Sequence, residues 1–292
     1  MTEHAYGTGR HHPPAGPSDA VTGPSLPSAL AHRLRVLWVI AVAEFKLKYA
    51  GSALGYVWSV LKPLALFTLL YLVFGRVFNL NELSPYYSVS LLVGIVLFTF
   101  FGDASTLALI SVVARDAVIR KLAFPRVIIP TSATVTAALT LLINLSVLGL
   151  FLAYKRISPS VEWLLVPPLL VELYIFTLGV GLLLSALFVR LRDLQQVWEL
   201  ALQLFFYASP IIYPVGFLPG WARDIIFLNP FTQVLQDIRA ILLPDVGADF
   251  LVTAESALGS GGRLVPLSVA LATFAAGYLL FRHEEPWFAE RV

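Results

Sequence analysis

Four polar side chains interrupt the long apolar segments of this 292-residue sequence, namely Asp103, Asn144, Glu172 and Glu199. Ionisable and polar groups are costly in lipid, so we expect these side chains to face other helices or a water-filled path. Two carboxylates such as Asp103 and Glu172 would also suit a proton relay. The sequence contains no cysteine, which excludes disulfides and thiol catalysis, and its histidines show no metal-ligand spacing, so no metal site is predicted.

The composition indicates that these residues belong to a membrane protein. Hydrophobic residues make up 58% of the sequence and charged residues 13%, whereas a soluble domain has about 25% charged residues. A chain with so little polar surface cannot cover a water-soluble fold, and the bilayer must supply most of its solvent. The net charge of +2 gives no reason to expect a nucleic-acid partner. We therefore predict an all-α polytopic membrane protein.

Six apolar segments are long enough to cross a bilayer, which takes about 20 helical residues. They are Trp58–Phe78, Val89–Val113, Val127–Tyr154, Val161–Val189, Val197–Tyr213 and Leu264–Phe281. Between the fifth and sixth lies Pro214–Arg263, whose shorter apolar stretch has prolines at both ends. This pattern predicts short re-entrant helices rather than another span.

The region before the first span divides into a tail and a helix. Residues 1–28 are rich in proline and glycine, which predicts a disordered cytoplasmic tail. Residues 29–56 carry one apolar stripe (Leu34, Trp38, Ala41, Phe45) with Arg33, Glu44 and Lys48 on a neighbouring polar edge. This pattern predicts an amphipathic interface helix followed by an elbow. The alternative is a first spanning helix, although its continuous apolar run, Val36–Ala43, is far shorter than a span requires.

The basic residues predict the orientation of the chain. Fourteen of the twenty lysines and arginines fall on the segments that would share one side of the membrane with the N-terminus. The positive-inside rule places both termini in the cytoplasm. We expect residues 57–285 to form the six-span domain and residues 286–292 a short cytoplasmic C-terminus.

Three local patterns carry a family resemblance. They are Lys48–Trp58 (KYAGSALGYVW) running into Leu61–Leu64, then Ile119–Arg126 (IRKLAFPR), and then Arg192-Asp193-Leu194, Ser209–Tyr213 (SPIIY) and Asn229-Pro230-Phe231. With these patterns in this order, about residues 30 to 285 resemble the transmembrane subunits of type-2 ABC exporters. The branch resembled moves polysaccharides such as O-antigen, capsule, wall teichoic acid and cell-wall galactan.

The resemblance implies that Arg115–Arg126 is a coupling helix that inserts into a cleft of a separate ATPase subunit. The alternative is a plain positive-inside loop, which explains the charges but not an aromatic ring at Phe124. The sequence has no Gly-Lys pair and hence no phosphate loop of its own, so ATP and Mg²⁺ would bind on the partner ATPase. The candidate coupling residues are Arg115, Arg120, Lys121, Phe124, Pro125, Arg126, Arg192 and Asp193.

The resemblance also implies a site for the pyrophosphate of a lipid-linked glycan at the elbow. Basic and aromatic side chains at the membrane interface suit lipid phosphate, and small residues let the chain turn there. An ordinary flexible elbow would account for the glycines alone. The candidate residues are Lys46, Lys48, Tyr49, Gly51 and Ser52.

Aromatic residues are concentrated in the second and fifth predicted spans. Because sugars stack on aromatic rings, an aromatic-lined conduit would let a glycan slide without tight binding; the alternative is that most of these rings face lipid or pack in the core. The candidate pathway and gate residues are Phe98, Phe101, Asp103, Phe205, Phe206, Tyr207, Ser209, Pro210 and Tyr213.

By resemblance, the expected assembly is a homodimer of this chain with two ATPase subunits in a bacterial inner or plasma membrane. It would export a lipid-linked polysaccharide, and the chain itself would not be an enzyme. The alternatives are a drug or lipid exporter of the same family, a proton-coupled secondary transporter using Asp103 and Glu172, and, less favoured, an integral glycosyltransferase.

Overall fold

The computed structural model describes residues 26–50, 54–115, 125–243 and 251–288, which form helices and connecting loops without a strand. Five of these helical segments are long and apolar enough to cross a membrane. They are Val57–Val77 (helix α2 continued by the π-helix η1), Tyr87–Ala114 (α4), Ile128–Tyr154 (α6), Val161–Phe188 (η2 and α7) and Leu264–Trp287 (α12 and η4). The fold class, an all-helical protein with several apolar spans, is thereby confirmed.

The prediction of six spans is not confirmed, because the predicted fifth span is too short. Helix α8 covers Leu194–Ala208, only 15 residues. It ends where Ser209 adopts an extended backbone with ψ of 145°, as the residue before a proline usually does. The segment that follows, through Tyr213, is a turn rather than the last turns of a helix.

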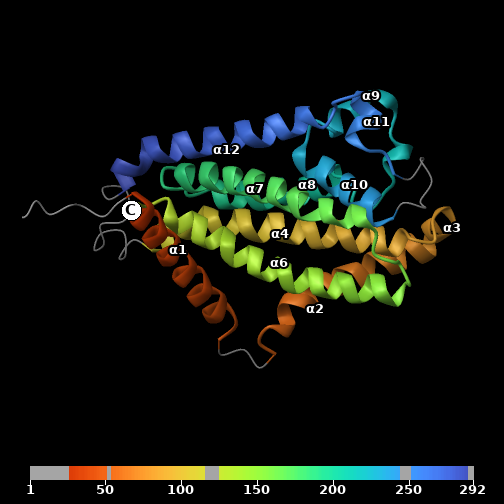
Figure 1. Ribbon diagram of the computed structural model, residues 1–292, viewed down its shortest axis with the longest axis horizontal. Coiled ribbons are helices and arrows are strands. Elements are labelled where there is room, and N and C mark those ends of the chain that lie inside the picture. The colour runs from red at the N-terminus through yellow and green to blue at the C-terminus, as the bar shows by residue number, and fades with distance from the viewer. Residues whose placement is uncertain (1–25, 51–53, 116–124, 244–250, 289–292) are drawn as a thin grey trace, which may run out of the picture.

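The long helices lie side by side, with α4 at the centre (Figure 1). Helix α4 packs against α6 and α7, while α12 packs along α7 and α2 lies against α4 and α6. Helices α7 and α12 approach each other closely where Gly179 meets Gly277. A Cβ built on Gly179 would lie 2.6 Å from backbone atoms of Phe274, so this packing requires glycine.

Helix α1 (Leu26–Tyr49) runs obliquely beside the bundle and packs against α6 (Figure 1). Its predicted division into an apolar and a polar face is not confirmed. Leu34 and Trp38 of the predicted apolar stripe are more than half exposed, whereas Ala41 is fully buried. Glu44 from the predicted polar edge turns toward α6, where it contacts Ser132 and Thr136.

Short helices follow the break after α8. They are η3 (Val215–Phe217), α9 (Gly220–Ile226), α10 (Pro230–Leu242) and α11 (Ala254–Leu258); α3 (Leu80–Leu83) connects η1 to α4. Helices α9 and α11 lie at the end of the bundle opposite the C-terminus (Figure 1). Helix α10 packs against α7, α4 and α12. Its start is encoded locally, since Asn229 Oδ1 accepts a hydrogen bond from the Phe231 N–H and Pro230 occupies the first helical turn.

Candidate functional site

A cleft of about 240 Å³ opens between the end of α1, the start of α2, the middle of α4 and Thr140 of α6. At its edge the ammonium of Lys48 lies 3.1 Å from a carboxylate oxygen of Asp103, and both side chains remain partly exposed. The exposed Lys62 also lines the cleft. Trp58, Thr99, Thr106 and Thr140 are among its other lining residues.

The cleft combines the groups that recognise a phosphate at a membrane surface. Two ammonium groups and one carboxylate leave a net positive charge, and the threonine hydroxyls can donate hydrogen bonds. The Asp103 carboxylate holds Lys48 against α4, so this lysine is positioned by a helix of the bundle. In the sequence, Lys62 counted toward the orientation of the chain and belonged to the Leu61–Leu64 part of a family pattern, but it was not predicted to bind phosphate.

The structure thus brings together one predicted phosphate-binding residue, Lys48, and one predicted pathway residue, Asp103. Lys46 is exposed and does not line the cleft. The side chain of Tyr49 and the residues Gly51 and Ser52 lie outside the described part of the chain.

Four of the predicted pathway rings form one cluster. Phe98 and Phe101 of α4 contact Phe205 and Phe206 of α8, with centroid distances of 4.9 Å between Phe98 and Phe206 and 5.2 Å between Phe101 and Phe205. Phe231 of α10 joins them at 5.4 to 6.0 Å. Phe101, Phe206 and Phe231 are buried within the protomer, whereas Tyr207 is 60% exposed.

The predicted gate segment after α8 is held by a buried arginine. Arg239 of α10 donates to the carbonyl oxygens of Ser90, Pro210 and Ile211 at 2.6 to 3.0 Å. Ser209 and Pro210 are buried there. The hydroxyl of Tyr213 donates to the carbonyl of Ala208 at 3.0 Å. These contacts fix the turn to both α4 and α10.

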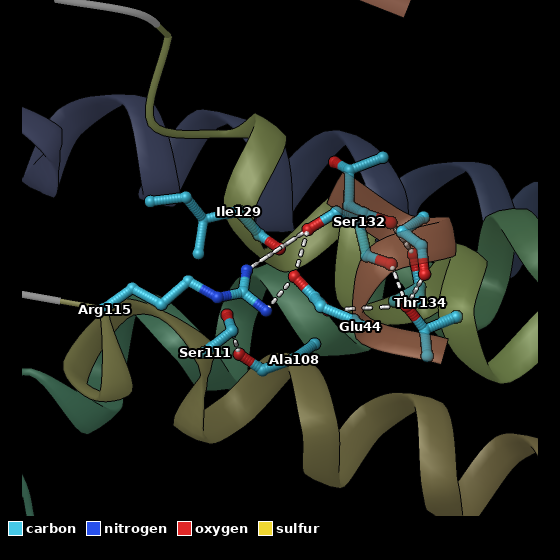
Figure 2. A network of polar contacts seen from close by, with 10 residues as sticks. Glu44, Ala108, Ser111, Arg115, Ile129, Ser132 and Thr134 are labelled. Atoms are coloured by element: carbon cyan, nitrogen blue, oxygen red, sulfur yellow. Dashed lines mark hydrogen bonds and ion pairs between the residues drawn. The ribbon is translucent and has the colours of Figure 1, made fainter. Parts of the chain in front are cut away.

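Arg115 lies at the C-terminal end of α4, the end opposite Ser90, and belongs to the polar network of Figure 2. Its guanidinium forms an ion pair with Glu44 of α1 and donates to Ser132 Oγ of α6 at 3.2 Å and more weakly to the Ile129 carbonyl. Thr136 Oγ1 lies 3.4 Å from the second oxygen of Glu44. Arg115 therefore ties α4, at the start of the predicted coupling segment, to both α1 and α6.

The remaining coupling candidates lie near this end or outside the described residues. Arg120, Lys121 and Phe124 belong to the part of the chain that is not described. Pro125 and Arg126 immediately precede α6, where Arg126 bonds to Glu285. Arg192 lies with its guanidinium carbon 5.6 Å from the Phe188 ring, and Asp193 is the N-cap residue of α8.

A second polar cluster lies between α7, α10 and the start of α12. Gln233 donates to Asp237 at 2.8 Å, and Arg263 forms an ion pair with the same carboxylate at 3.1 Å. Glu172 of α7 is close enough to interact with Asp237 and Gln233.

These contacts separate the two carboxylates of the proton-relay alternative. Asp103 pairs with Lys48, whereas Glu172 belongs to the α7–α10 cluster. Asn144 is buried and donates within α6 to the Thr140 carbonyl, and Glu199 accepts from Gln195 on the exposed side of α8. Among the described residues, no group of three His, Cys, Asp or Glu residues could hold a metal ion.

Sequence reasoning missed Glu44, Lys62, Arg239 and Asp237 as residues of these sites. Asp237 and Arg239 could have been noticed, because ionisable residues in a segment expected to enter the bilayer usually serve a function or have a partner. Nothing in the local pattern around Glu44 indicated that its partner would be Arg115.

Residues 35–243 match the ABC-2 type transporter family. The chain is similar to the "O-antigen export system permease protein RfbA" of Klebsiella pneumoniae, with 32% identity over 73% of this chain and 82% of the relative. The protein of the same name from Myxococcus xanthus is 29% identical over 85% of this chain and 92% of the relative. The "Polysialic acid transport protein KpsM" of Escherichia coli is 22% identical over 69% and 78%. With several helices suited to cross a membrane and most of its length matched, the chain belongs to the ABC-2 type transporter family.

Proposed function

We propose that this chain is the transmembrane subunit of an ATP-driven exporter that moves a lipid-linked polysaccharide out of the cytoplasm. The names of its relatives, which refer to O-antigen export and polysialic acid transport, support the polysaccharide as substrate. The exporter would lie in a bacterial inner or plasma membrane with both chain termini in the cytoplasm. The permease itself would carry out no hydrolysis.

The observation that carries the lipid-linked part of this proposal is the cleft at Lys48, Lys62 and Asp103. A lipid-linked glycan presents an anionic pyrophosphate at the membrane surface, and each nearby lysine attracts such a surface charge by about 1 kcal/mol. Thr99 and Thr106 add hydroxyl donors on the α4 side of the cleft.

A separate ATPase would supply the energy. The sequence has no phosphate loop, and ABC-2 permeases work with a nucleotide-binding subunit. The described contact residues lie at the end of the bundle that carries the C-terminus: Arg115 ends α4, Pro125 and Arg126 precede α6, and Arg192 and Asp193 lie between α7 and α8 (Figure 1). ATP and Mg²⁺ would bind on that partner.

A second copy of the chain would complete the pathway. Helix α8 exposes Gln195, Gln196, Glu199 and Gln203, and polar groups of this kind are costly against lipid. A second protomer, or a water-filled path shared with it, would remove these side chains from lipid. The exposed ring of Tyr207 and the Lys48 cleft would then contribute to that path, with the ring cluster of α4, α8 and α10 behind them.

The short helices after α8 would form the re-entrant part of the fold. Helix α9 has 7 residues and α10 has 13, fewer than the roughly 20 needed to cross. Because Arg239 and Asp237 of α10 have polar partners within the protomer, this helix can be buried at membrane depth without exposing charge to lipid.

The test is transport by the complete complex in proteoliposomes, with the co-purified ATPase and a radiolabelled lipid-linked glycan. We expect translocation to require ATP and to continue in the presence of a proton uncoupler. Translocation that stops with the uncoupler while ATP is held constant would instead favour the proton-coupled reading. Failure of any ATPase to co-purify with the wild-type chain would refute the proposed division of labour.

The cleft is tested in the same vesicles with Lys48→Glu combined with Lys62→Glu. We expect export to be lost while the complex still assembles, because attraction of the headgroup becomes repulsion. The matched control is Lys155→Glu combined with Arg156→Glu, which introduces the same change of charge away from the cleft, directly after α6. Normal export by the double variant would remove the cleft from the proposal.

A further inference from the structure

The C-terminal end of α12 connects the two segments that are predicted to face the ATPase. Glu285 accepts a hydrogen bond from the backbone N–H of Arg126 at 3.0 Å, and the Arg126 guanidinium donates to the Glu285 carbonyl. The neighbouring Glu284 forms an ion pair with Arg190 at 2.7 Å. Arg126 lies at the entrance to α6, and Arg190 lies two residues before Arg192 in the loop between α7 and α8.

The two glutamates are themselves held firmly. The carboxylate of Glu284 is 6% exposed, although its partner Arg190 is 48% exposed. Phe281 and Phe288 on either side are buried and pack edge to face at 5.1 Å in a core shared with α4, α6 and α7. Along its length, α12 is also locked to α7 by the contact between Gly179 and Gly277.

We propose that Glu284 and Glu285 are positioning residues that hold the two ATPase-facing segments at a fixed spacing. The inference rests on the proposed function, because it takes Arg126, Arg192 and Asp193 as contacts of an ATPase subunit. A subunit that binds both segments needs them in one relative position. Helices α6 and α7 also pack directly against each other, and the end of α12 adds polar contacts to both segments through adjacent residues.

The spacing can be measured without an ATPase. Because the chain has no cysteine, Leu191→Cys and Thr131→Cys introduce one pair of spin-label sites, on the α7–α8 loop and one turn into α6. Leu191 is 58% exposed and can carry a label without repacking. Labelled chain is diluted with unlabelled chain so that distances between protomers do not contribute. We expect a narrow distance distribution that broadens in Arg190→Gln and in Glu285→Ala.

The second measurement is the stimulation of the ATPase in the assembled complex. We expect each variant to lower export per ATP hydrolysed on the order of fivefold, at the lower end of typical coupling between sites. Arg263→Gln is the matched control: its ion pair at the other end of α12 joins a 47% exposed arginine to a fully buried carboxylate. This control should cost similar stability but leave both the label distance and the coupling ratio at wild-type values.

An unchanged label distance in both variants would overturn the proposal. So would a broadened distance with wild-type coupling, because the anchor would then not matter to the ATPase. An equal loss of coupling in Arg263→Gln would assign the effect to general destabilisation and also overturn it. Failure of the proposed function would be seen separately, as a wild-type chain that binds no ATPase while the label distances still respond.

Discussion

The contact between α7 and α12 gives a prediction whose sign and size follow from the coordinates. In Gly179→Ala, the new Cβ would lie 2.6 Å from the Cα and N atoms of Phe274, where ordinary contact begins at 3.4 Å. The shortfall is about 0.8 Å. Because the opposing atoms are backbone atoms, no side-chain rotation can relieve it, and the helices must separate along their contact.

The expected cost combines two opposing effects. Overpacking a well-packed contact costs about 1–3 kcal/mol, and alanine gains up to about 1 kcal/mol over glycine inside a helix. We therefore expect a net loss of about 1–2 kcal/mol, a factor of roughly 5 to 30 in the folding equilibrium. The matched control is Gly149→Ala in α6, where nothing lies within 4 Å of the new Cβ, so only the helix-forming gain should be seen.

The assay is reversible unfolding of the purified chain in mixed micelles, followed by circular dichroism for wild type and both variants. Gly179→Ala should unfold at a lower denaturant fraction than wild type, and Gly149→Ala at an equal or higher one. Equal stabilities of the two variants would refute the reasoning, because the sequence change is identical and only the space around the Cβ differs.

Three further predictions concern the polar contacts and the coupling segment. Glu44→Gln removes the ion pair with Arg115, in which both side chains are about one quarter exposed. It should destabilise the chain by about 1–2 kcal/mol, between the values for exposed and buried pairs, and a double-mutant cycle with Arg115→Gln that shows no coupling energy would contradict this. Asp103→Asn should weaken binding of the lipid-linked glycan, because the carboxylate positions Lys48. A binding titration in nanodiscs measures this, and stronger binding would show instead that the negative charge of Asp103 dominates. Phe124→Ala should lower ATPase association without altering membrane topology, because an aromatic anchor in a partner cleft can contribute 2 kcal/mol or more, and wild-type co-purification would return the segment to an ordinary loop.

Five of the spans were predictable because a helix that crosses the bilayer must be apolar over its whole thickness, which takes about 20 residues. The predicted Val127–Tyr154 and the observed Ile128–Tyr154 differ by one residue. The predicted fifth span is longer than the observed helix, because the prediction followed the hydrophobicity of the segment and not a helix-ending signal within it. Ser209 precedes Pro210, a position that disfavours helix, and the helix ends there even though apolar residues continue beyond it.

The polar contacts were only half predictable. The sequence marks which side chains need a partner, and Asp103 was expected to avoid lipid for that reason. The sequence does not show which partner each side chain has, because the pairs join residues far apart in the chain: Lys48 with Asp103, and Glu44 with Arg115. Helical periodicity assigned Glu44 to a polar edge, but that pattern gave no sign that this side chain would turn into the bundle toward Arg115.

The break after α8 and the burial of Arg239 explain each other. A helix that stops at Ala208 leaves the carbonyls of Pro210 and Ile211 without helical donors, and buried carbonyls need donors. The planar guanidinium supplies several N–H groups in a fixed fork, which here reach both carbonyls and that of Ser90. Gly94 makes the approach possible, because a Cβ there would lie 2.9 Å from Nη2 of Arg239. The predicted gate residues Ser209 and Pro210 therefore cannot move alone. A displacement of the turn either carries α10 with it or leaves the buried Arg239 with the Ser90 carbonyl but without those of Pro210 and Ile211, which is the costlier course.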